Sequence, residues 1–313
     1  MKKVKAALLS IVSNSCLVVM KLVAGMMMFS VSVLSEAVHS MMDLIAAIIA
    51  NYSVRKAVKP PDKEHTYGHG KYENVAGIIE AVLIFFAAAI IIYESIVKVL
   101  IGSPVEFLEI GIVIMGISTV VNFFVSRYLS RVAEEEDSIA LEADSMHLKT
   151  DVLTSLGVFV GLILINLTGL RILDPIIAIL VAVLIIRAAY KLTMESSKGL
   201  VDEKLPPEEE MVIRNVLLEH MPEFVEFHDI RTRKGGDQRF IDLHLVMKAD
   251  TSVEDSHKVA DHLELEIRKR LPHTSVMIHV EPCDWRNCPL SDENRMIEIE
   301  DKSKSRTKGK KAQ

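Results

Sequence analysis

The chain has 313 residues, of which 50% are apolar and 25% are charged, and its mean hydropathy is +0.29. Long apolar runs fill residues 1–200, whereas residues 201–313 are densely charged, so the composition excludes a disordered chain and a wholly soluble one. A formal net charge of -6 argues against nucleic acid as the main partner. We expect a membrane domain over 1–200, a cytoplasmic α+β domain over 201–286 and a basic, disordered tail over 287–313.

Six apolar segments in the first domain are each close to the roughly 20 residues that a helix needs to cross a lipid bilayer. They are residues 6–33, 34–54, 75–99, 105–127, 145–167 and 172–189. If the N-terminus is inside, thirteen lysines and arginines face the inner side, against only Lys98 and Arg171 on the outer side. The pattern predicts an all-α, six-helix domain in a plasma (inner) membrane, with both termini in the cytoplasm.

The charged second domain shows shorter, alternating elements. Prolines at 206 and 207 followed by three glutamates predict the start of a helix. Residues 227–233 and 239–248 are typical of two strands around the hairpin turn KGGD. A helix over 255–271 and a third strand over 274–281 complete the predicted α+β fold.

Two of the apolar segments carry the same pair of ionisable residues at the same spacing. His39 and Asp43 lie in the second segment, and His147 and Asp151 lie in the fifth. A spacing of four places each pair on one helix face, so two such faces together offer two nitrogens and two oxygens for tetrahedral zinc. Either pair alone is also explained by an interhelical hydrogen bond; the repetition favours a metal site.

The loop after the second segment contains a second candidate metal site. Asp62, His65 and His69 fall within eight residues of one another. This is a moderate signal for a site built on a loop and a helix start. Glu80, at the start of the next segment, is an ionisable residue whose role the sequence leaves open.

Histidines are also concentrated in the second domain. Those predicted to bind metal lie one on each strand and one on the helix between them, and the third strand adds an acid on the same face as its histidine. These residues are His228, His244, His257, His279 and Glu281. We interpret His220, His262 and His273 as ordinary surface residues.

The motifs SEAVHSMMD, HTYGHGKYE, ADSMHLKTDV, HDIRTRKGG, FIDLHL and IHVEPCD together resemble those of the cation diffusion facilitator family, in its prokaryotic zinc and iron efflux branch. The resemblance covers about residues 6–285. It implies a homodimer, a cytoplasmic domain of metallochaperone-like, ferredoxin-like fold, and export of a divalent metal driven by inward proton flow.

The resemblance also implies roles for the candidate residues. The four intramembrane residues would form the transport site, the loop residues a second site, and the cytoplasmic histidines with Glu281 a two-metal site that holds two subunits together. It pairs Lys71 with Asp202 as a charged latch. Two residues depart from the family pattern. His39 stands where many bacterial relatives have aspartate, and in the family a histidine at this position favours zinc over cadmium. Glu281 stands where the relatives have aspartate.

The sequence therefore predicts a zinc/proton antiporter in which zinc is both cargo and a structural or regulatory ion. One alternative is the same transporter with iron, cadmium, cobalt or manganese as its cargo. Another is a membrane metal sensor or scaffold that does not transport. The sequence has no H-E-x-x-H motif, so we do not expect a metalloenzyme.

Overall fold

The computed structural model describes residues 2–28, 31–101, 109–168 and 173–283. The predicted tail over 287–313 lies outside the described residues. The chain divides into two compact units. The first contains Met1–Asp202 and the turn Gly235–Asp237, and the second contains Glu203–Lys234 and the chain from Gln238 onward.

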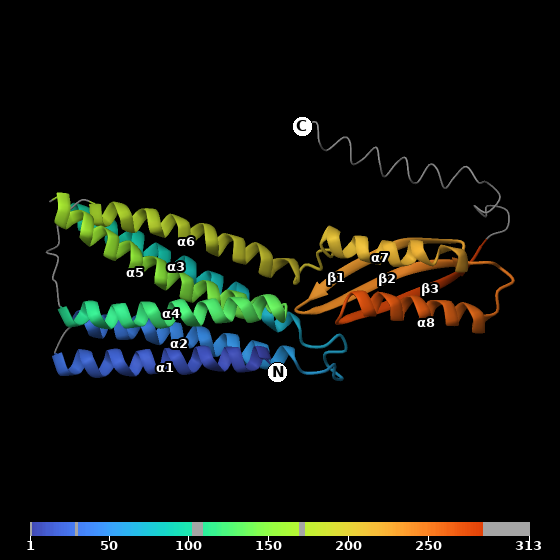
Figure 1. Ribbon diagram of the computed structural model, residues 1–313, viewed down its shortest axis with the longest axis horizontal. Coiled ribbons are helices and arrows are strands. Elements are labelled where there is room, and N and C mark those ends of the chain that lie inside the picture. Colours follow the sequence, from blue (N-terminus) through green and yellow to red (C-terminus); the bar gives the residue numbers. More distant parts are fainter. Residues whose placement is uncertain (1, 29–30, 102–108, 169–172, 284–313) are drawn as a thin grey trace, which may run out of the picture. The chain divides into compact units, whose positions relative to one another are not determined.

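The first unit is a bundle of long helices, and each predicted apolar segment is one of them (Figure 1). They are α1 (Lys2–Met28), α2 (Val31–Ala57), α3 (Lys71–Ile101), α4 (Glu109–Glu135), α5 (Ile139–Thr168) and α6 (Leu173–Lys198). Most extend beyond the apolar segment at one or both ends, because polar residues of good helix propensity continue the helix. α5, for example, begins six residues earlier than predicted.

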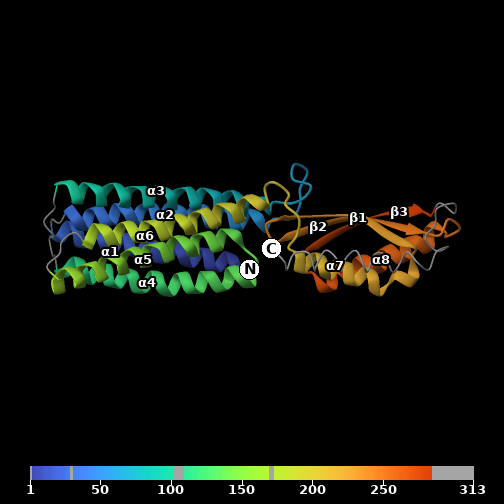
Figure 2. The same ribbon diagram turned by 90° about the horizontal axis from the view of Figure 1, so that it is seen from above.

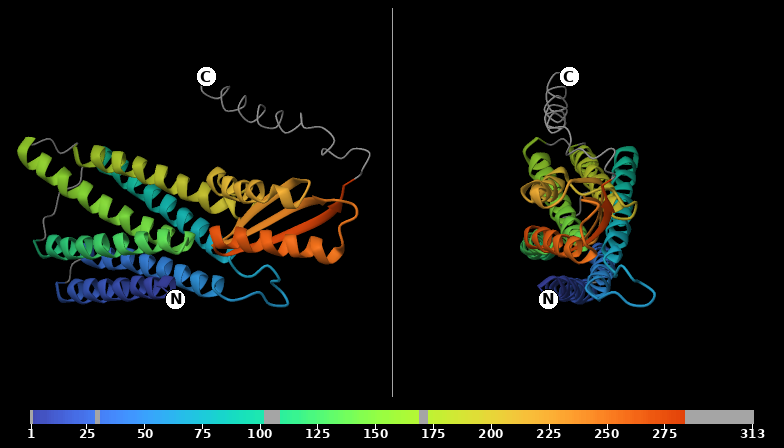
Figure 3. Two further views of the ribbon diagram at one scale, coloured as in Figure 1. Left: turned by 45° about the vertical axis from the view of Figure 1, so that its right-hand side comes forward. Right: turned by 90° about the vertical axis from the view of Figure 1, so that its right-hand side faces the viewer.

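Within the bundle the helices pack mainly in pairs. α1 lies along α2, α3 along α6, and α4 along α5, as Figures 2 and 3 show. α5 also packs against α2, α3 and α6. This central position brings residues of α5 close to those of α2 and α3.

Among the described residues, three helices are long and apolar enough to cross a membrane: Lys2–Ala24, Lys71–Val97 and Pro175–Lys198. Each of α2, α4 and α5 includes side chains outside the described set, and the search covers the described residues alone. α3 and α6 expose large apolar side chains such as Phe86, Leu100 and Leu180. Apolar surface of this kind is what a helix presents to lipid.

The second unit contains the predicted helices and strands in the predicted order. They are α7 (Pro207–Glu219), a short 3₁₀ helix η1 (Met221–Glu223), β1 (Glu226–Gly235), β2 (Gln238–Met247), α8 (Val253–Arg270) and β3 (Thr274–Pro282). The sheet order is β1-β2-β3, and β2 and β3 run parallel with His244 opposite His279.

Both helices of this unit cover the same face of the sheet (Figure 2). Ile213 and Leu217 of α7 and Leu263 of α8 pack against Ile241 and Leu243 of β2 in one buried core. Alternate residues of a strand point to opposite faces. His244 therefore lies on the face that α7 and α8 leave uncovered.

Candidate metal centres

The first candidate centre lies where α2 meets α5 in the helical unit. Asp43 of α2 and His147 and Asp151 of α5 each offer a ligand atom, and these atoms lie within 4.8 Å of one another. Asp43 and His147 are buried, and Asp43 Oδ1 is 3.1 Å from His147 Nε2. The spacing of four on α5 puts His147 and Asp151 on one face of that helix, as predicted.

His39, the fourth predicted ligand, lies four residues before Asp43 in the same helix. Its side chain lies outside the described residues, so its part in the centre stays a prediction.

These donors have the spacing that a small divalent cation requires. Two ligand atoms at 2.0–2.2 Å from a tetrahedral zinc are about 3.3–3.6 Å apart. Asp43 Oδ1 and His147 Nε2 are already near that distance at 3.1 Å. The other ring nitrogen of His147, Nδ1, has no hydrogen-bond partner among the described residues. One imidazole and two carboxylates thus lie close enough together to be candidate ligands of one divalent metal ion.

Two further buried carboxyl groups lie near this centre. Glu80 of α3 and Asp144 of α5 are both 0% exposed and interact electrostatically. Neither oxygen of Glu80 has a hydrogen-bond partner among the described residues, and Asp144 has the Ser10 hydroxyl beside it. The sequence analysis did not single out Asp144. Its position three residues before His147, on the same side of a helix, was the available signal.

The second candidate centre is the loop between α2 and α3. Asp62, His65 and His69 place their ligand atoms within 4.8 Å of one another. Asp62 Oδ1 is 3.3 Å from His65 Nδ1, and Asp62 Oδ2 is 3.2 Å from His69 Nε2. The positive φ of Gly68, 82°, allows the tight turn that brings His69 back toward Asp62. The structure thus brings together all three predicted loop ligands.

Backbone hydrogen bonds favour the ionised form of Asp62. The N–H groups of His65 and Glu64 donate to Asp62 Oδ1 at 2.7 and 2.9 Å. These bonds, with that of His65 first, lower the pKa of Asp62 below its ordinary value. A carboxylate held in this way offers its second oxygen to a cation.

The third candidate centre is on the uncovered face of the sheet. Glu281 of β3 is at its middle: its carboxylate oxygens are 2.9 Å from His244 Nδ1, 3.4 Å from His228 Nε2 and 3.7 Å from His279 Nε2. The rings of His244 and His279 are 4.9 Å apart, because the parallel register places them side by side. Despite its extra methylene, Glu281 reaches all three imidazoles.

Asp229 is a member of this cluster that the sequence analysis missed. His228, Asp229 and His244 have ligand atoms within 4.8 Å of one another. In a regular strand residues 228 and 229 would point to opposite faces. Asp229 has a φ of +49°, and Phe227 and Ile230, three residues apart, both pack on the core, so the strand is irregular here. No sequence pattern indicated this left-handed residue.

His257, the remaining predicted ligand, lies elsewhere in the described unit. It is on α8, its side chain is 72% exposed, and its Nε2 is 3.4 Å from Asp261 on the same helix. α8 covers the other face of the sheet. Within one chain, His257 is therefore not brought to Glu281, and its role as a ligand stays a prediction.

The predicted pair of Lys71 and Asp202 is present in the helical unit, with Lys71 Nζ donating to Asp202 Oδ1 at 2.9 Å. Both side chains are exposed, at 40% and 49%, so the pair stabilises the fold by about 0–1 kcal/mol at most.

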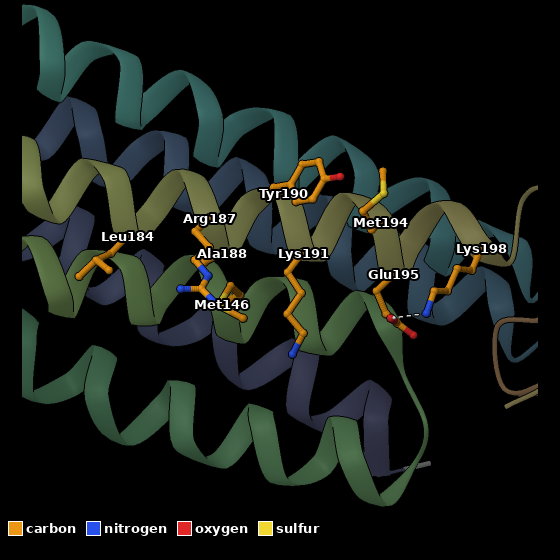
Figure 4. A pocket seen from close by; sticks show the side chains of 9 residues that line it. All are labelled: Met146, Leu184, Arg187, Ala188, Tyr190, Lys191, Met194, Glu195 and Lys198. Atoms are coloured by element: carbon orange, nitrogen blue, oxygen red, sulfur yellow. Dashed lines mark hydrogen bonds and ion pairs between the residues drawn. The ribbon is translucent and has the colours of Figure 1, made fainter. Parts of the chain in front are cut away.

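A hollow of about 590 Å³ opens along α6, and the described residues that line it form no group of metal-type donors (Figure 4). Its charged lining is Arg187, Lys191, Lys198 and Glu195, and Glu195 is already paired with Lys198 at 3.1 Å. Three cationic side chains against one paired carboxylate repel a divalent cation. The donor clusters described above are elsewhere.

Comparison with known proteins decides the family. Residues 7–201 match the model of the cation efflux transmembrane domain, and residues 205–283 match that of the cation efflux protein's cytoplasmic domain. The chain belongs to the cation efflux family. It is thus a divalent cation efflux transporter with a membrane domain and a cytoplasmic domain, as the resemblance implied.

Relatives cover most of the chain. The uncharacterized transporter sll1263 of Synechocystis sp. is 35% identical over 89% of this chain and 90% of its own length. The cation-efflux pump FieF of Citrobacter koseri is 31% identical over 89% of this chain and 92% of its own. Among solved structures, the metal-bound C-terminal domain of the CzcD transporter from Thermotoga maritima is 32% identical, with a TM-score of 0.23, over 24% of this chain and 87% of that chain.

Proposed function

We propose that this cation efflux protein exports zinc from the cytoplasm in exchange for protons. The observation that carries the proposal is the buried convergence of Asp43, His147 and Asp151 from two helices. Ionisable residues inside a membrane domain are costly and are retained for function. A cluster of three, with ligand spacing, is the arrangement that a transported metal ion needs.

The same atoms that bind zinc also bind protons. Zinc requires a neutral imidazole with a free lone pair and ionised carboxylates. In the described geometry His147 Nε2 and Asp43 Oδ1 are 3.1 Å apart, a distance at which one proton is shared in a hydrogen bond. When both ring nitrogens of His147 carry a proton, zinc binding at Nε2 releases one proton to the solvent, and a returning proton displaces zinc. Competition for one lone pair thus couples metal export to proton entry.

We further propose that two copies act together in the plasma membrane, with both chain ends in the cytoplasm. The match to the family's cytoplasmic domain and the excess of lysine and arginine on one side support this. Two groups would hold resident zinc ions: Asp62, His65 and His69 in the loop, and His228, His244, His279 and Glu281 on the sheet. His257, exposed on α8, is free of the cluster in its own chain and available to the partner subunit.

The test is transport by the full-length protein in proteoliposomes that contain a zinc indicator or a pH-sensitive dye. We expect zinc flux with opposite proton flux for the wild type, and loss of both for His147→Ala and Asp43→Asn. Glu195→Gln, an exposed change on α6, is the matched control and should transport normally. Unchanged flux in the two site variants would show that the ion crosses elsewhere.

A panel of metals in the same assay addresses the alternatives. Faster flux of iron, cadmium, cobalt or manganese than of zinc would identify that metal as the cargo and leave the proposed transport site unchanged. Tight zinc binding without flux of any metal would favour a sensor or scaffold over a transporter.

A further inference from the structure

A separate group of metal-type donors lies on the helix side of the second unit. His220 follows the last residue of α7, Glu223 ends η1, and His262 is in the middle of α8. Their ligand atoms all lie within 4.8 Å of one another. The sequence analysis treated both histidines as ordinary surface residues. The fold brings them together where the end of α7 packs on α8.

One imidazole of this group is oriented in the way that metal ligands are. His220 Nδ1 is 2.8 Å from the carbonyl oxygen of Val216. A carbonyl only accepts, so Nδ1 carries the proton and Nε2 keeps its lone pair. A hydrogen bond from the second ring nitrogen to a carbonyl is the usual support of a histidine that binds metal, because it fixes both the tautomer and the ring plane.

The second imidazole is close and suitably inclined. The ring centroids of His220 and His262 are 4.9 Å apart and the rings are inclined by 70°. The side chains of His262 and Glu223 are exposed and can rotate. A shift of about 1 Å in their ligand atoms would reduce the separations, now within 4.8 Å, to the roughly 3.5 Å between two ligands of a tetrahedral zinc ion. The site faces solvent, so a metal ion can enter without unfolding.

Three acidic side chains lie near the two histidines, and in the described part of the chain only one of them is not paired with a cation. Glu266 interacts electrostatically with both histidines, and Glu219 with His220. These two acids are themselves tied to Lys269 and Arg270, whereas Glu223 makes no ion pair among the described residues. Glu223 is thus the carboxylate that remains for a ligand.

We propose that His220, Glu223 and His262 form a zinc site of their own, with water completing the coordination. Two imidazoles and one carboxylate with an open fourth position suit zinc. The site lies on the α7–α8 side of the sheet, opposite the cluster around Glu281, and joins the end of α7 to α8. The choice of zinc as the bound metal rests on the proposed function, whereas the grouping of the three donors is independent of it.

The experiment counts zinc bound to the full-length protein in detergent, by equilibrium dialysis followed by elemental analysis. We expect His262→Ala to bind one zinc fewer per chain than the wild type, and Glu223→Gln to bind that ion more weakly. Both residues are exposed, so the variants should fold. His273→Asn is the control, because asparagine tolerates the positive φ of 57° at that exposed position, and it should bind as many ions as the wild type.

Equal zinc counts in the wild type and both site variants would overturn the proposal, and so would an equal loss in His273→Asn. Zinc transport measured on the same preparations separates this from the proposed function. If the wild type carries no zinc across proteoliposomes, the proposed cargo is wrong, while the difference in bound zinc between wild type and His262→Ala still decides the site.

Discussion

A buried ion pair between α1 and α3 makes a quantitative prediction about the stability of the helical unit. Lys3 Nζ is 3.0 Å from Glu73 Oε1, and the two side chains are only 4% and 0% exposed. The hydroxyl of Ser138 donates to the other oxygen of Glu73. Lys3 Nζ is also 2.9 Å from Asp237 Oδ2. Replacing Lys3 with methionine keeps the length of the side chain but leaves both carboxylates, the fully buried one of Glu73 above all, without their cation.

The expected cost follows from the burial. Removing one partner of a buried ion pair costs about 3–5 kcal/mol, because the remaining charge stays desolvated. Ser138 and the N-terminal position of Glu73 in α3 retain part of its stabilisation, so the lower value of about 3 kcal/mol applies. For a unit of this size 1 kcal/mol shifts the thermal midpoint by about 2–4 °C. Lys3→Met should therefore lower the midpoint by about 6–12 °C.

The assay is thermal unfolding of the full-length protein in detergent, followed by circular dichroism. Lys2→Met is the matched control, because Lys2 pairs with Glu135 at 3.6 Å with both side chains exposed, and it should shift the midpoint by about 2 °C or less. Adding Glu73→Gln to Lys3→Met should restore part of the loss, since the Glu73 charge is gone while Asp237 keeps its own. If Lys3→Met and Lys2→Met behave alike, the pair does not stabilise the bundle as argued.

Three further predictions concern other parts of the fold. Hydrogen bonds from Arg270 lower the pKa of Glu219, so they stabilise the fold above the ordinary pKa near 4.5, and this stabilisation is lost as the pH falls through the lowered pKa. Arg270→Gln should therefore reduce the thermal midpoint at pH 7 but progressively less below pH about 4. An equal reduction at every pH would contradict this. Glu80→Met should raise the free energy of unfolding by about 1–3 kcal/mol in the same thermal assay, because it removes a buried carboxyl group that has no hydrogen-bond partner among the described residues. A lower midpoint would mean that the carboxyl group of Glu80 makes a stabilising interaction. Ser252 accepts a hydrogen bond from the backbone N–H of Asp255 at the start of α8, so Ser252→Ala should cost about 1 kcal/mol in urea unfolding, and an unchanged midpoint would exclude this capping role.

Local periodicity predicted much of this structure. The spacing of four in α5 placed His147 and Asp151 on one face, and the alternation of β2 and β3 placed His244 beside Glu281. These predictions succeed because regular helices and strands repeat the same geometry at every residue.

The features that the sequence did not reveal depend on contacts between distant segments or on irregular backbone. The closeness of His220 to His262 arises only when α7 packs on α8. The burial of Asp144 depends on the neighbours of α5, which one sequence does not specify. Asp229 joins its cluster through a left-handed conformation that an extended strand pattern does not predict.

The division of the first centre between α2 and α5 affects how tightly an ion can be held. α2 packs along α1, whereas α5 packs along α4 and α6, so the two halves of the centre belong to different helix pairs. A slide of one pair past the other by a single residue rise, about 1.5 Å, would shift Asp43 relative to His147 by about half of the 3.1 Å that separates their ligand atoms. The packing between the two helix pairs can thus control how an ion is bound and released at this centre.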